Sequence, residues 1–482
     1  MTGWPRILVE EWRYWSRSRL TLSALVLLLL IAIAAVINTQ SRVDAEASAR
    51  ESMQSAAEEA FLSQPDRHPH RMVHYGHYVF RTPSPLAIID PGVDPLTGTV
   101  MFLEGHRQNT ATFPAAYTAP RVTGFDRLTP AFAYQVLVPL VLIVVGFSSV
   151  SRERELQTNV QLIAQGVDPG RVWLGKALAL LVLSGIALLP LHVSAFGAIA
   201  AGESALAAGA MVIGYFLYLA FWSFAIVGIS ARARSGAMSL LWCCVAWTVI
   251  AVLMPRLAGD VAGTVSPVRG KIASDFELIA ELRELGDGHN AAGPAFDQFR
   301  AHVFEEYGVD RAEDLPVNLR GLIAEESEAR LTEVLNKFAE RRMAEEVTQA
   351  QFARSGALLS PSLAIRNVSM QTAGSDLENH HRFLREAEAA RFEFVQGLNR
   401  AHGYELSYID DINRNKDEDS WMRARVSKEN WRVLQSFDFE PAPAADRVQA
   451  ASGGLCVLLV WCFSAGGFGW FGIRDQGRMY EK

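Results

Sequence analysis

The chain has 482 residues, of which 50% are hydrophobic and 20% charged, and its formal net charge is −7 at pH 7. This length exceeds that of one ordinary soluble domain. The hydrophobic and charged residues lie in separate stretches, which excludes a wholly soluble protein and is typical of membrane spans joined by water-exposed segments.

The first 19 residues are expected to form a helix at the membrane surface. Large apolar side chains share one face of this helix: Trp4, Leu8, Trp12 and Trp15. Basic side chains occupy the other faces: Arg13, Arg17 and Arg19. Tryptophan together with basic residues suits the headgroup layer of a bilayer. An ordinary flank of the first span would explain the pattern equally well.

Six apolar segments are long enough to cross a bilayer, which takes about 20 residues. They are Leu20–Ile37, Ala131–Val150, Leu174–Ile199, Leu206–Ser230, Gly236–Met254 and Ala450–Ile473. The first is interpreted as a retained span, because the run is long and lacks a convincing signal-peptide cleavage site. The third is interpreted as one span despite Pro190, because membrane helices tolerate kinks.

Lys and Arg in the short segments predict the orientation. They fall on one side of the membrane if the N-terminus is cytosolic: Arg6, Arg13, Arg17, Arg19, Arg152, Arg154, Arg171, Lys176, Arg232, Arg234, Arg474, Arg478 and Lys482. We therefore expect a multi-pass protein of the bacterial cytoplasmic (inner) membrane. The helix over residues 1–19, the segment 151–173 and the tail 474–482 would be cytosolic, and residues 38–129 and 255–449 would be extracytoplasmic.

The first outer segment, 38–129, is expected to be a mixed α/β loop. Its start, Asp44 to Leu62, is rich in Ala and Glu and predicts a helix. Three short runs then predict strands separated by turns: Val79-Phe80, Leu86–Ile89 and Val100–Leu103.

Four histidines lie close together in this loop: His68, His70, His74 and His77. Imidazole suits copper or zinc. The alternative is a polar loop whose histidines bond to backbone and water, and Arg67 and Arg71 nearby disfavour a cation. We expect no metal here, and these four residues are the candidates should one bind.

The second outer segment, 255–449, is expected to be mostly helical. Apolar residues recur every three or four positions in Asn318–Arg354 and again in Ser375–His402, which predicts two helices packed as an antiparallel hairpin. Ser360-Pro361 breaks the chain between them. All four cysteines (Cys243, Cys244, Cys456 and Cys462) lie in the spans, so the outer segments must hold together without disulfides.

The polar segment 151–173 is the most informative part of the chain. It opens with four alternating charges: Arg152, Glu153, Arg154 and Glu155. Leu156, Val160 and Ile163 then follow at i, i+4 and i+7, which predicts one apolar helix face. Gly166 suits a helix C-cap and Pro169 a turn. Such a helix either packs on its own bundle or docks into a cytosolic partner.

This segment resembles the coupling segment of type-2 ABC transporter permeases. The residues that carry the resemblance are Glu153-Arg154-Glu155, Pro169, Arg171 and Leu174-Gly175-Lys176. The resemblance implies that a separate cytosolic ABC ATPase receives the segment and binds ATP and Mg. It assigns the partner contact to Arg152, Glu153, Arg154, Glu155, Leu156, Val160, Ile163, Pro169, Arg171 and Lys176. It also implies a second permease copy or a paralogue beside this chain.

Two further stretches resemble the subset of these permeases with large outer loops. The matching residues are Tyr75-Gly76-His77-Tyr78, Ser84-Pro85-Leu86-Ala87, Ser360-Pro361 and Ala373-Gly374-Ser375-Asp376. The expected fold class is therefore mainly α: a polytopic six-helix transmembrane bundle with a large, mostly helical extracytoplasmic domain and a smaller mixed α/β outer loop.

Residues Gly170–Ala177 nearly match a phosphate-binding loop, but Ala177 replaces the hydroxyl that would hold magnesium and a span follows. Gly-x-Ser-x-Gly and His-Glu-x-x-His motifs are absent, so we expect a non-catalytic subunit without a cofactor of its own and without a nucleic-acid partner. The expected function is that of the permease subunit of an ATP-driven exporter. The alternative is a mechanotransmission scaffold that moves its outer domain without passing a substrate.

Overall fold

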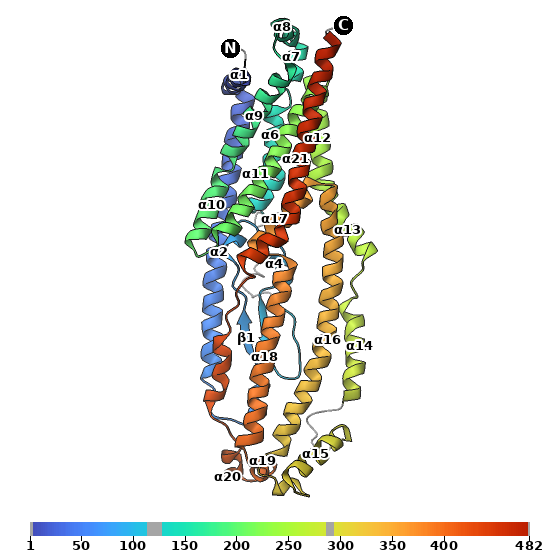
Figure 1. Ribbon diagram of the computed structural model, residues 1–482. Coiled ribbons are helices and arrows are strands. Elements are labelled where there is room, and N and C mark those ends of the chain that lie inside the picture. The colour runs from blue at the N-terminus through green and yellow to red at the C-terminus, as the bar shows by residue number, and fades with distance from the viewer. Residues whose placement is uncertain (1–2, 113–127, 286–293, 481–482) are drawn as a thin grey trace.

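The computed structural model describes residues 3–112, 128–285 and 294–480, and most of these residues are helical. Figure 1 shows an elongated molecule in which the first and last helices reach the same end. We call this the terminal end and the opposite one the distal end. Helix α1 (Trp4–Arg17) lies at the terminal end, and α15 (Asp297–Tyr307), α19 (Tyr408–Asn413) and α20 (Glu418–Arg423) lie at the distal end.

Six helical segments in the described chain are long and apolar enough to cross a membrane, as the sequence predicts. They are α2 (Arg19–Leu62), the stretch Pro130–Glu155 that contains α5 (Pro130–Phe132) and α6 (Val138–Gly146), α9 (Pro169–Ala187), α11 (Ala205–Arg232), the stretch Gly236–Val265 that contains α12 (Gly236–Trp247) and α13 (Met254–Val265), and α21 (Ala444–Tyr480).

The third apolar segment differs from the single span expected for it. Helix α9 ends at Ala187, and a second helix, α10 (Leu189–Ala200), begins after Leu188. Pro190 lies in the first turn of α10, where its missing N–H costs no hydrogen bond and its fixed φ suits the start of a helix. The proline therefore begins a new helix.

Helix α2 continues far beyond the apolar run that predicts the first span. Its 44 residues would extend about 66 Å at 1.5 Å per residue. The predicted first span and the helix predicted after it are thus one continuous element. This helix physically connects the terminal end with the distal part of the molecule (Figure 1).

The described part of the first outer segment contains one small antiparallel sheet. Strand β1 (His77–Phe80) pairs with β2 (Val100–Leu103), with His77 opposite Leu103. The strand predicted over 86–89 is wrong, because Pro85–Ile88 forms a 3-10 turn. Ser84 caps this turn by accepting a hydrogen bond from the Leu86 N–H at 3.2 Å. Two short helices complete the loop: α3 (Pro69–Val73) and α4 (Asp94–Thr97).

The predicted helical hairpin is confirmed as α16 (Leu319–Ser355) and α18 (Leu377–Glu405). Glu346 pairs with His381 at 2.7 Å, and Glu340 pairs with Arg385 at 2.6 Å. The residue number of the partner thus falls along α16 as it rises along α18, which makes the two helices antiparallel. Helix α14 (Lys271–Leu285) lies beside α16 (Figure 1).

A further helix, α17 (Pro361–Ala373), forms where the sequence predicts only a break. It packs between α11 and α21, and its side chains belong to the same core as the spans. Tyr215 and Tyr218 on α11 hydrogen-bond to Ser369 and Ser362 at 2.9 and 2.8 Å. The hairpin is therefore anchored in the bundle by the segment that joins its two helices.

The two outer segments meet beside α17. The Ser375 hydroxyl donates to the Asp90 carbonyl at 2.7 Å, and the Val93 N–H donates to the Ser375 carbonyl at 2.9 Å. Gly92 has a φ of +53°, and a Cβ there would lie 2.1 Å from the Ser375 oxygen. Only glycine fits this crossing, which joins the α/β loop to the start of α18.

Candidate coupling site at the terminal end

The segment 151–173 lies at the terminal end and forms two short helices before α9 begins (Figure 1). These are α7 (Ser151–Glu155) and α8 (Thr158–Ala164). The single helix that would align Leu156 with Val160 does not form, because Gln157 has a left-handed backbone, with φ +58°. Gly166 ends α8 as predicted, with φ +77°.

The charged residues that open the segment point into the protein. Arg152 pairs with Glu11 of α1 at 2.5 Å, and Glu153 pairs with Lys176 of α9 at 2.6 Å. Lys176 also contacts Glu11 and donates to the Ser149 carbonyl at 2.6 Å. We call Glu11, Arg152, Glu153 and Lys176 the terminal ion cluster. It joins α1, α7 and α9 in one network.

The cluster is balanced, with two carboxylates and two cations. Glu11 is only 3% exposed and Lys176 only 1%, so each buried charge must be neutralised by its ion-pair partners. Burial by itself would raise the pKa of Glu11, but Lys176 and Arg152 lower it below its usual value. Glu11 is therefore ionised at neutral pH, and the network is held by charge as well as by hydrogen bonds.

The next two residues tie α7 to the link between α11 and α12. Arg154 donates to the Ala231 carbonyl at 2.6 Å. Glu155 accepts from the Gly236 N–H at 3.0 Å, at the first turn of α12. A carboxylate at a helix N-terminus is favoured by the exposed N–H groups and the helix dipole. A displacement of α7 would therefore act on α1, α9, α11 and α12 together.

Two apolar side chains of the same segment, those of Leu156 and Val160, face outward. Leu156 is 68% exposed and Val160 is 38% exposed. Ile163 lies with Val160 on α8. We call Leu156, Val160 and Ile163 the tip residues. The structure thus separates the charged anchor of this segment from its exposed apolar end.

The remaining predicted residues lie where the chain enters α9. Asp168 is the N-cap, accepting from the Arg171 N–H at 3.1 Å, and Pro169 is in the first turn. The Arg171 side chain is exposed, whereas Lys176 belongs to the terminal ion cluster. Sequence reasoning missed Glu11, whose only local signal is a single acid on a helix face next to tryptophans.

Helix α1 forms as expected, but part of its aromatic face packs against protein. Trp15 is only 3% exposed, and Trp12 packs against the same core. A Cβ added at Gly175 of α9 would lie 2.7 Å from Ile7, so this glycine allows α1 and α9 to approach closely. The near-match to a phosphate-binding loop at 170–177 is helical throughout, with its glycines at packing contacts.

A family model described as ABC-2 family transporter protein matches residues 6–282, more than half of the chain. The chain belongs to this family. Permeases of this kind are typically non-catalytic membrane subunits that work with an ATPase. A second model, a domain of unknown function (DUF3526), matches residues 275–440, which contain the α16–α18 hairpin. No curated protein and no solved structure matches the chain significantly.

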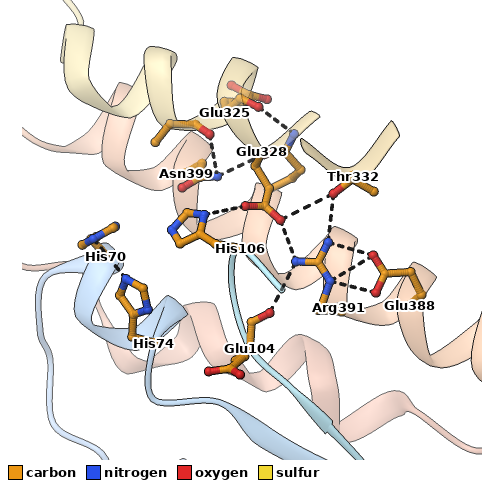
Figure 2. Close-up of polar contacts among 12 residues, drawn as sticks. His70, His74, Glu104, His106, Glu325, Glu328, Thr332, Glu388, Arg391 and Asn399 are labelled. Carbon is orange, nitrogen blue, oxygen red and sulfur yellow. Dashed lines mark hydrogen bonds and ion pairs between the residues drawn. The ribbon is translucent and has the colours of Figure 1, made fainter. Parts of the chain in front are cut away.

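The four loop histidines of the permease fall into three different environments. His68 contacts His402 and Asp411, far along the chain. His70 and His74 lie with His106 (Figure 2). His77 is buried and packs against Phe61 with ring centroids 4.6 Å apart. Sequence reasoning missed His106 and His402, because only the fold places His106 beside His70 and His74 and His402 beside His68.

The buried Asp411 organises the distal end. His68 and His402 contact its two oxygens at 3.0 and 2.9 Å, and Arg414 pairs with one of them. Burial by itself would raise the pKa of Asp411, but the hydrogen bonds from His402 and His68 lower it far below its usual value. Asn318, the N-cap of α16, donates to the same carboxylate at 3.3 Å. Asp411 thus joins the first loop to both hairpin helices.

Proposed function

We propose that this permease is the membrane subunit of an ATP-driven exporter-type complex in the bacterial cytoplasmic membrane, with both termini in the cytosol. A separate ABC ATPase binds ATP and Mg and docks on the tip residues. The observation that carries this proposal is the exposure of Leu156 and Val160 on a segment whose charged residues are anchored inside. An exposed apolar surface on a firmly held element suits a partner contact.

The contacts define a route for the motion. Closure of the ATPase would push α8 and α7. The terminal ion cluster passes this displacement to α1 and α9, and the contacts of Arg154 and Glu155 pass it to α11 and α12. Helix α11 packs against α17, which joins the two helices of the hairpin. Movement at the terminal end thereby reaches the distal helices that would receive or release cargo.

A second permease copy or a paralogue completes the proposed complex. Support comes from α14, which lies outside the six candidate spans. Its Ile272 and Phe276 are 75% and 71% exposed. Large apolar side chains that are exposed and do not belong to a predicted membrane span are typical of an interface between subunits.

The docking surface is tested by replacing Val160 with Asp. The new carboxylate would be buried unpaired against the ATPase at a cost of roughly several kcal/mol. We expect the ABC ATPase that co-purifies with the wild-type chain to be lost, while the permease still inserts. The matched control is Gln161→Glu, which adds a charge to the same exposed helix without removing an apolar contact. Unchanged co-purification and ATP turnover for Val160→Asp would count against this surface.

A second candidate function is mechanotransmission, in which the ATPase moves the outer helices and nothing crosses the bilayer. The observation that favours it is the continuity of α2, which joins the terminal end to the distal part as one helix. Two measurements on vesicles supplied with ATP distinguish export from mechanotransmission. An exporter releases cargo as ATP is consumed, whereas a mechanotransmitter changes only the labelling rate of a distal probe such as Asn415→Cys.

A further inference from the structure

We propose that His70, His74 and His106 form a binding site for a divalent transition-metal ion of the zinc class. One ring nitrogen from each residue lies within 4.8 Å of the other two. The histidines come from two parts of the loop, α3 with its C-cap and the turn after β2 (Figure 2). Imidazole is a preferred ligand of Zn²⁺ and Cu²⁺.

The first two ligands are spaced as a metal requires. His70 and His74 are four residues apart, which places them on one side of a helical turn. Their Nε2 atoms are 3.2 Å apart. Two nitrogens bound tetrahedrally to zinc at about 2.05 Å would lie about 3.3 Å from each other. The side chains therefore need little movement to bind one ion.

The third histidine is oriented by a carboxylate. The Nδ1 of His106 lies 2.9 Å from Oε2 of Glu328, which is fully buried on α16. Donation of the Nδ1 proton to this carboxylate makes Nε2 the lone-pair nitrogen, the form in which imidazole binds a metal. The His106 backbone has φ +63°, an uncommon conformation that places the ring at this position.

Glu328 is itself held in place by an arginine. Arg391 of α18 pairs with its Oε1 at 2.6 Å and with Glu388 at 2.8 Å. Arg391 also donates to the Thr332 hydroxyl at 2.9 Å, so its guanidinium is fixed beside Glu328. A histidine that binds a metal commonly donates its other N–H to such a carboxylate, which strengthens the ligand. Figure 2 shows this chain from His106 through Glu328 to Arg391.

The other histidine cluster does not compete for this role. His68, His402 and Asp411 are buried, and Asp411 already contacts Arg414 and Asn318. By contrast, His74 is exposed and His70 and His106 are half-buried, which leaves a path for an ion from solvent.

The two arginines close to His70 in the sequence oppose a cation only weakly. Arg67 lies over the Tyr75 ring at 5.6 Å. Arg71 is exposed, and it follows His70 directly, so it points to a different side of the helix.

Metal binding would have a mechanical effect. The ion would join α3 to the turn after β2, and His106 would extend that link through Glu328 to α16. Three protein ligands leave one tetrahedral position for water or for a donor atom of another molecule. Occupancy would therefore stiffen the contact between the α/β loop and the hairpin and leave a coordination site open to solvent.

The experiment uses the full-length chain in detergent, purified with a tag that contains no histidine. Zn²⁺ is titrated by calorimetry, and Co²⁺ absorption reports tetrahedral coordination. We expect one ion per chain. His70→Gln, His74→Gln and His106→Asn should each weaken binding at least about tenfold. Asn is chosen at position 106 because it tolerates positive φ.

The matched control is His302→Gln, which removes an exposed histidine on α15 and should leave the affinity unchanged. Unchanged thermal unfolding of the metal-free variants would show that they fold. A wild-type chain that binds no Zn²⁺ would overturn the proposal. Equal affinities in the wild type and in the variant that lacks all three histidines would also overturn it.

Discussion

Glu11 shows how much a single side chain contributes at the terminal end. It is the one residue of α1 that reaches both Arg152 and Lys176, and it is 3% exposed. Its neighbour Glu10 pairs with Arg13, in a contact whose side chains are 54% and 61% exposed. Adjacent acids of the same type thus occupy opposite environments, and their substitution should have very different effects.

We expect Glu11→Gln to destabilise the permease by about 3 kcal/mol, because it leaves buried cations without their shared carboxylate. The loss is expected at the low end of the range for buried pairs, since Lys176 keeps Glu153. Glu10→Gln should cost less than about 1 kcal/mol, as exposed pairs do. Unfolding in detergent, followed by tryptophan fluorescence, measures both variants. Equal losses would argue against the terminal ion cluster.

His380 should make the stability of the distal part depend on pH. Burial, helped by Arg81 and His381, lowers its pKa to about 4. Because its folded pKa lies below the unfolded value of about 6.5, its contribution is present above pH 6.5 and is lost as the pH falls towards 4. The linkage predicts a loss of about 2 kcal/mol between pH 8 and pH 5 from this residue.

His380→Leu removes the titration while keeping a side chain of similar size. The free energy of unfolding of the variant should therefore fall less steeply between pH 8 and pH 5 than that of the wild type. Denaturant unfolding at a series of pH values gives both slopes. His68 and His77 also have lowered pKa values because they are buried, so the difference between the two slopes, not the wild-type slope, isolates His380. Identical slopes would contradict the prediction.

At the scale of elements, glycines set the distance between the two hairpin helices. A Cβ added at Gly321 of α16 would lie 2.2 Å from the Gly403 nitrogen of α18. Gly397, also on α18, has no atom within 4 Å of such a Cβ. The first glycine is therefore required by the helix crossing, whereas the second is not.

Gly321→Ala should destabilise the hairpin by about 1–3 kcal/mol, because backbone atoms must move apart. Gly397→Ala should instead be neutral or stabilising by up to about 1 kcal/mol, since alanine favours a helix interior. Hydrogen exchange of the α16 and α18 amides measures the local effect of each change. A loss of protection in Gly397→Ala equal to that in Gly321→Ala would show that space at the crossing does not matter.

At the scale of the whole molecule, the orientation in the membrane decides how every other feature is used. Gln165 and Asn415 are exposed side chains near opposite ends of the molecule. Both can therefore serve as cysteine probes in a background from which the four native cysteines have been removed: Cys243, Cys244, Cys456 and Cys462.

We expect an impermeant maleimide to label Asn415→Cys on intact cells and to leave Gln165→Cys unlabelled until the cells are opened. The physical reason is the concentration of Lys and Arg at the terminal end, which favours the cytosolic side. Since both positions are exposed, protection cannot result from burial in the protein. If only Gln165→Cys were labelled on intact cells, the terminal end would lie outside the cell and the predicted orientation would be wrong.

The sequence by itself determined the elements whose signal is local. Long apolar runs predicted the six spans, and spacing of three and four predicted α16 and α18. Local chemistry was decisive even where the structure differs from our interpretation. Pro85 begins a 3-10 turn where we expected a strand, and Pro190 lies in the first turn of a new helix where we expected a kink.

Only the tertiary structure decided which distant residues meet. Glu11 lies 165 positions from Lys176, and His68 lies 343 positions from Asp411. Such pairings leave no periodic signal, because they depend on how whole helices pack. The same packing placed four neighbouring histidines in three separate environments and brought His106 next to His70 and His74. Local periodicity encodes where helices form, whereas close packing of those helices decides which buried charges find partners.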